Sequence, residues 1–68
     1  KPLNKKLIKR SIDIISKITN TDTKFATILF EKSNYKIKHA IVMHIKNIDY
    51  KNADQLLDAN QGFLYKII

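Results

Sequence analysis

The sequence contains no cysteine and no tryptophan, and only one proline and one glycine among its 68 residues. Without cysteine, neither a disulfide framework nor a thiolate zinc site can form. No apolar run approaches the roughly 18 residues that a membrane-spanning helix needs, and no signal peptide is recognisable. We therefore expect a single cytoplasmic domain with no membrane contact, and its small size predicts low stability.

Acidic residues are also scarce: 6 stand against 13 lysines and arginines, which gives a formal net charge of +7. A basic surface of this kind can attract phosphate or nucleic acid. However, only one of the basic residues is arginine, the residue best suited to bidentate contacts with bases and phosphates. We interpret the lysines as a solvated face and do not expect nucleic-acid binding. A small basic module that binds nucleic acid or protein is the alternative function.

A strong helical pattern runs through the chain, and residues 36–48 are expected to form its central helix. Six residues there share one side at the i, i+3, i+4, i+7 spacing of a core stripe: Ile37, Ala40, Ile41, His44, Ile45 and Ile48. Val42 and Met43 fall on the far side, where an isolated domain would expose them. A helix that is apolar on more than one side has more than one neighbour, so these two residues suggest a piece of something larger.

The sequence predicts three more helices, over residues 4–19, 23–32 and 50–59. Asn4, Asp22 and Asp49 are the expected N-caps, because their side chains can accept hydrogen bonds from the free amides of the first turn. The first helix is amphipathic, with its apolar residues within one half of the helical wheel: Leu7, Ile8, Ile12, Ile14, Ile15 and Ile18.

The predicted helices end at residues that tolerate the left-handed conformation. These are Asn20, the turn at 33–35, Asn47 and finally Gly62. Ala26, Ala40 and Ala53 stand at mid-helix positions where two helices can approach closely.

The apolar tail 63–68 would add one or two turns, with Leu64 and Ile68 packing back on the bundle. No period-two strand pattern competes. We predict an all-α bundle of four short helices and a C-terminal helical turn.

Cap and core positions together resemble the C-terminal region of bacterial N-acetylmuramic acid 6-phosphate etherases. That region has an N-x-K-L-x-x-R opening, a T-G turn, an S-x-x-x-A helix start, a K-x-A-I-V-M segment and a paired-leucine helix closed by glycine. Their counterparts here are residues 4–10, 19–20, 22–26, 38–43 and 56–62. Asn20 and Asn47 replace glycines of the family, Asn34 and Tyr35 replace Gly-Gly, and His44 replaces a leucine-like residue.

The resemblance implies a helical fold similar to ubiquitin-associated domains, with a three-helix core in residues 4–68. It also implies a larger sugar-phosphate isomerase-type α/β domain upstream, to which residues 1–3 would be the tether. The whole enzyme would be a cofactor-independent, homodimeric, cytoplasmic lyase. It would cleave the lactyl ether of N-acetylmuramic acid 6-phosphate to N-acetylglucosamine 6-phosphate and D-lactate in peptidoglycan recycling. Lys6 and Arg10 are the basic candidates for a place near its phosphate or sugar.

Nothing in this chain suggests that it performs the elimination itself, which needs an acid and a base on opposite sides of a bound sugar. Asp22 and Asp49 are explained as caps. The other four acids are expected on solvated surfaces: Asp13, Glu31, Asp54 and Asp58. His39 and His44 are about 140° apart on a helix, not at the i, i+4 spacing of a zinc pair. We therefore expect no catalytic residue, metal or cofactor, with His44 half-buried and His39 exposed or touching the parent domain.

Two other binding functions are disfavoured. A ubiquitin-associated domain usually has a Met-Gly-Phe/Tyr loop after its first helix, and residues 19–22 contain nothing like it. A helix-turn-helix DNA reader needs Arg, Asn or Gln on an exposed recognition helix, whereas the central helix offers Lys, His, Val and Met.

The preferred hypothesis is a docking role on the α/β domain or on the other protomer, where the bundle would help to shape or cover the substrate pocket. The candidate interface residues are His39, Val42, Met43, Phe63 and Tyr65. The alternative is that Val42 and Met43 are scattered apolar surface residues with no partner.

Overall fold

The computed structural model describes residues 4–67, and within that range it contains four α-helices, one short 3-10 helix and no strand. In chain order these are α1 (Lys5–Thr19), α2 (Thr23–Lys32), α3 (Ile37–Ile45), α4 (Tyr50–Ala59) and the 3-10 helix η1 (Leu64–Lys66). The predicted all-α bundle with a C-terminal helical turn is confirmed. Ile68, which was expected to pack back on the bundle, lies outside the described residues.

Three helices begin at the side-chain caps that the sequence predicts. The side-chain oxygens of Asn4, Asp22 and Asp49 each accept a hydrogen bond from the amide three residues on, at 2.8–2.9 Å. The hydrogen bond that caps the start of α3 was not predicted from the sequence. There the hydroxyl of the buried Ser33 accepts from the Lys36 amide at 3.2 Å and donates to a carbonyl of α2 at 2.7 Å.

All four helices end in the same way. A left-handed residue, with φ between 54° and 59°, is followed by an amide that donates to the carbonyl five residues back. This is the Schellman closure, which satisfies carbonyls that the helix leaves free. The left-handed residues are Asn20, Asn34, Asn47 and Gln61. Gly62 is also left-handed but stands second in its turn, and Tyr35, at φ 61°, takes the equivalent second place after α2.

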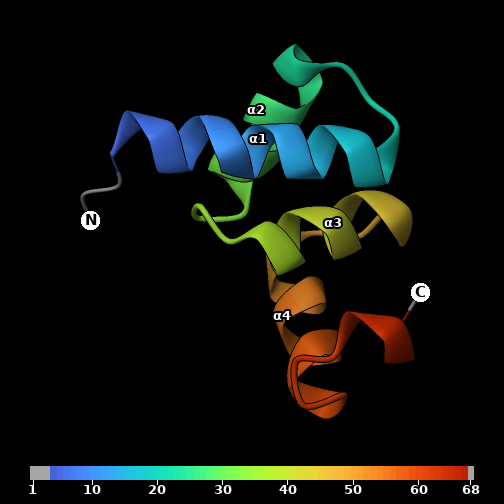
Figure 1. The fold of residues 1–68 in the computed structure, drawn as a ribbon. Coiled ribbons are helices and arrows are strands. Elements are labelled where there is room, and N and C mark those ends of the chain that lie inside the picture. The colour runs from blue at the N-terminus through green and yellow to red at the C-terminus, as the bar shows by residue number, and fades with distance from the viewer. Residues whose placement is uncertain (1–3, 68) are drawn as a thin grey trace.

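The helix α3 lies in the middle of the molecule, as Figure 1 shows. On one side it packs against α1 and α2, and on the other side α4 and η1 lie against it. The chain therefore forms two layers of contact around one short helix. This arrangement decides which of its residues are buried.

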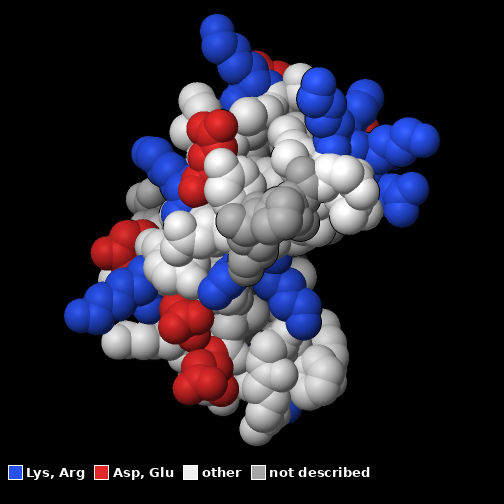
Figure 2. Space-filling view, turned by 90° about the vertical axis from the view of Figure 1, so that its left-hand side faces the viewer, with Lys and Arg blue, Asp and Glu red and all other residues white. Residues whose placement is uncertain are grey.

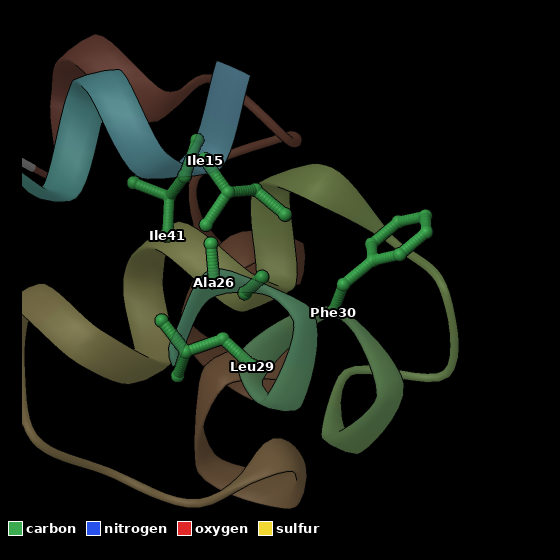
Figure 3. Packing of buried hydrophobic residues seen from close by; sticks show 6 residues of the cluster. Ile15, Ala26, Leu29, Phe30 and Ile41 are labelled. Carbon is green, nitrogen blue, oxygen red and sulfur yellow. The ribbon is translucent and has the colours of Figure 1, made fainter. Parts of the chain in front are cut away.

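Two apolar clusters form on the two sides of α3. The larger joins α1, α2 and α3 through Ile15, Ala26, Leu29, Phe30, Ala40 and Ile41 (Figure 3). The smaller joins α3 and α4 through Val42, Ala53 and Leu57, and Leu64 packs against both clusters. Ala26, Ala40 and Ala53, where the sequence predicts that two helices approach closely, have no exposed surface.

The sequence prediction for Val42 is wrong. This residue was expected on the outside of the domain, but α4 covers it and its exposed fraction is 0%. The reasoning that a helix with two apolar sides has two neighbours is correct, but the second neighbour belongs to this chain. Ile45 is the opposite case: it was placed in the core stripe and is 41% exposed.

Candidate functional site

A cluster of four polar side chains bridges α3 and α4. Lys36 Nζ donates to the Tyr50 hydroxyl at 2.8 Å, and His39 Nε2 donates to an Asp54 carboxylate oxygen at the same distance. The rings of His39 and Tyr50 stack with centroids 5.0 Å apart and an interplanar angle of 22°. We call Lys36, His39, Tyr50 and Asp54 the polar clasp, because each bond joins one helix to the other.

His39 was expected to be exposed or to touch the parent domain, and the clasp shows that it is not exposed. Its side chain is only 14% exposed, because Tyr50 covers one face of the ring and Asp54 takes Nε2. The other ring nitrogen, Nδ1, is buried with no hydrogen-bond partner among the described residues. The hydrogen bond to the Tyr50 hydroxyl raises the pKa of the exposed Lys36 ammonium above its ordinary value.

This arrangement does not resemble an acid–base centre for a sugar. Asp54, the partner of His39 Nε2, and Tyr50, which stacks on the ring, both belong to this domain, so a substrate would have to displace one of them to reach that side of the imidazole. A general acid or base must instead lie within hydrogen-bond reach of the substrate. We conclude that the clasp holds α4 on α3.

The remaining acids have simple local surroundings. Asp22 and Asp49 cap helices, as predicted. Asp13 lies 3.6 Å from Lys9 one helical turn away; the Lys9 side chain is exposed and that of Asp13 is about half-exposed. Glu31 and Asp58 are exposed. Within the described range, no group of three or more His, Asp or Glu residues is arranged to hold a metal ion.

His44 is half-buried, as the sequence predicts. Its ring meets that of Phe25 edge to face, with centroids 5.4 Å apart, so it packs as an aromatic residue between α3 and α2. No helix of the described part of the chain combines the length and the apolar character that crossing a membrane requires.

The predicted interface residues are spread over the molecule rather than joined in one surface. Val42 is sealed inside and His39 is mostly covered, so neither offers a free surface for docking. Met43 is partly buried against the smaller cluster. Phe63 and Tyr65 are 45% and 73% exposed, and their rings contact each other with centroids 5.4 Å apart.

The main exposed apolar surface lies on α1, within the half of the helical wheel that the sequence shows to be apolar. Leu7, Ile14 and Ile18 are 46%, 37% and 49% exposed, whereas Ile8, Ile12 and Ile15 of the same helix face the core. Lys6 and Arg10 are exposed beside this surface. The sequence does contain a signal for this surface. The apolar residues of α1 span half of the helical wheel, which is wider than the side that one neighbouring helix can cover.

The described residues therefore define a small all-α domain whose most marked surface features are apolar and basic. No protein-family model matches the chain, and no solved structure does.

Curated proteins do match. The chain is 42% identical over 64 residues to the N-acetylmuramic acid 6-phosphate etherase of Francisella tularensis subsp. holarctica, which covers 94% of this chain and 22% of that protein. The etherase of Oenococcus oeni is 41% identical over 68 residues, covering 100% and 23%. That of Bacillus subtilis is 42% identical over 65 residues, covering 96% and 21%. The chain thus matches a C-terminal part of N-acetylmuramic acid 6-phosphate etherases and spans about a fifth of the length of these relatives.

Proposed function

We propose that this chain is the non-catalytic C-terminal helical domain of an N-acetylmuramic acid 6-phosphate etherase. The observation that carries the proposal is the match itself: nearly the whole chain aligns, at about 41% identity, with only about a fifth of each relative. In this proposal a sugar-phosphate isomerase-type α/β domain precedes the chain and holds the sugar phosphate. The complete protein is then a cytoplasmic homodimer that releases D-lactate during peptidoglycan recycling.

The arrangement of the acids supports the non-catalytic part of this proposal. The carboxylates of the described residues either cap helices, pair with a neighbouring base or point into open water. Asp13 shares one hollow with Lys5 and Lys9, and Asp49, which caps α4, shares another with Lys32. Neither hollow contains a second carboxylate or a histidine, the groups that most often partner a carboxylate in acid–base catalysis. The domain therefore contributes contacts and not proton transfer.

Docking on the larger body is the role that the surface supports. Nine large apolar side chains of this small domain remain at least 37% exposed, and contiguous exposed apolar surface marks interaction sites. Phe63 and Tyr65 are the two members of the sequence-predicted interface that are free to make such contacts. The helical core is proposed to be similar to a ubiquitin-associated domain.

The test uses the longer protein encoded together with this chain. It should contain a parallel α/β domain upstream of residue 1 and release lactate from N-acetylmuramic acid 6-phosphate. Asp13→Asn, Glu31→Gln and Asp58→Asn should leave kcat within about threefold of the parent, because effects of exposed groups on folding are small. A hundredfold loss of kcat in a folded variant, or an upstream sequence without the α/β pattern, would refute the proposal.

A further inference from the structure

A hollow of about 470 Å³ opens between the first turns of α1 and the turn that joins α2 to α3. Its lining comprises Leu7, Ser11, Phe30, Tyr35 and residues 36–39. The volume falls within the range of about 300–1,000 Å³ that is usual for protein binding pockets. The ring of Phe30 points away from the other labelled core residues (Figure 3), toward the chain that follows α2.

The hollow continues the exposed apolar surface of α1. Leu7, which lines the hollow, shares one side of that helix with Ile14 and Ile18 at the i, i+7 and i+11 positions. Together these three residues and the hollow form one apolar surface along α1, which we call the α1 face. Its three α1 residues are 37–49% exposed, so the described residues cover the α1 face only in part.

Tyr35 stands at the edge of the hollow in an unusual backbone conformation. Its φ is 61°, and the residue is half-exposed. Its ring meets that of Phe30 edge to face, with the two ring centroids 5.3 Å apart. The left-handed conformation costs a non-glycine residue about 1–2 kcal/mol. Gly62 occupies the corresponding place after α4, also with a positive φ, and glycine adopts this conformation without the steric cost that Tyr35 bears. The chain thus tolerates strain to keep an aromatic ring beside the hollow.

Basic residues border the α1 face. Lys6 and Arg10 are exposed next to Leu7 on α1, and no ion pair engages either among the described residues. Lys36 and Lys38 belong to the lining on the opposite side of the hollow. Figure 2, which views the molecule from the end where α1 begins, shows one group of basic side chains at the upper right, while others lie at the left and in the centre near acidic ones. A complementary surface would carry carboxylates around an apolar centre.

The position of the hollow indicates what covers it. It lies within the first two turns of α1, at the end of that helix nearest the N-terminus of the chain. The relatives match this chain in their C-terminal part, and the chain covers only about a fifth of their length. Resting on the proposed function, we infer that the α1 face is the docking surface for the preceding domain of the longer protein. An apolar side chain of that domain enters the hollow, and its carboxylates pair with Lys6 and Arg10.

Nitration of tyrosines in the longer protein tests this inference. Tyr35 and Tyr65 are 50% and 73% exposed in this domain, so tetranitromethane should modify them at similar rates unless another surface covers one of them. With rates normalised to the unfolded protein, we expect Tyr35 to react at least about tenfold more slowly than Tyr65. That ratio corresponds to about 1.4 kcal/mol in favour of the docked state.

A charge reversal on the α1 face should release Tyr35. Arg10→Glu places a like charge against the proposed carboxylates, and the Tyr35 rate should rise to that of Tyr65. The matched control is Lys24→Glu, an equally exposed reversal on α2 away from the hollow, which should change neither rate.

Two outcomes would overturn the inference. If Tyr35 and Tyr65 react alike in the parent protein, the hollow is open. If Tyr35 is protected only at concentrations where two protomers associate, a second copy covers it and not the preceding domain. Lactate release is measured in the same sample, so an active protein with a reactive Tyr35 contradicts this inference and leaves the proposed function standing.

Discussion

Replacing Val42 and Ile45 by aspartate gives the sharpest test of the packing around α3. The spacing in the sequence places Ile45 in the core and Val42 outside, whereas the structure buries Val42 completely and leaves Ile45 at 41% exposure. Val42→Asp removes about 1.5–3 kcal/mol of apolar burial and leaves a carboxyl group among apolar neighbours, which adds about 2–4 kcal/mol. The total of about 4–7 kcal/mol compares with about 3–10 kcal/mol for the stability of a whole domain of this size.

We therefore expect Val42→Asp to abolish cooperative unfolding and most of the helical signal. Ile45→Asp should remain folded, because its side chain reaches water and the loss is about 1–2 kcal/mol. The assay is urea unfolding followed by far-ultraviolet circular dichroism for the parent and both variants. If Ile45→Asp were the more damaging change, or if both variants unfolded at the same urea concentration, the placement of α4 over Val42 would be wrong.

Three further predictions concern local features. Asp22→Ala and Asp49→Ala should each cost about 1 kcal/mol in urea unfolding, and because they cap different helices their effects should add. Asn47→Val should cost about 1–2 kcal/mol, since a β-branched residue resists the left-handed conformation, whereas Asn47→Gly should be neutral or stabilising; equal effects would contradict the closure described for α3. The raised pKa of Lys36 means that the folded protein holds this proton more tightly than the unfolded chain does. The stability that Lys36 contributes is therefore complete below the ordinary lysine pKa and is lost as pH rises through the pKa of the folded state. Tyr50→Phe should return the Lys36 pKa to its ordinary range in an NMR titration, and alkaline stability should then fall less steeply with pH.

Helix boundaries could be read from the sequence because they depend on neighbouring residues. Asn4, Asp22 and Asp49 bond to amides only three residues away. Asn20 and Asn47 need only their own left-handed conformation. Because these interactions involve residues only a few positions apart, the helix ends were predicted within about two residues, the usual margin. The exception is the end of the central helix, which was predicted at residue 48, whereas α3 ends at Ile45.

The surface could not be read in the same way, because exposure depends on where distant helices lie. Val42 is buried by α4, and nothing near residue 42 specifies that helix as its cover. His39 is covered by Tyr50 and Asp54, which follow it by 11 and 15 residues. The sequence shows only that Leu7, Ile14 and Ile18 lie in the apolar half of α1. The packing of α1 shows that its neighbours cover Ile8, Ile12 and Ile15 instead and leave these three residues partly exposed.

The connections between helices have a consequence for how this chain reaches its native state. Each is only a few residues long and is bent by one or two left-handed residues, so nearly all helix pairs that touch are consecutive along the chain. The pairing of α1 with α3 is the exception among the main contacts. Short separations mean little loss of chain freedom before contacts form, and helical domains of this kind assemble in about milliseconds or less. During synthesis the domain can thus fold almost as soon as its last helix leaves the ribosome. Partly folded chains then have little time to associate with one another.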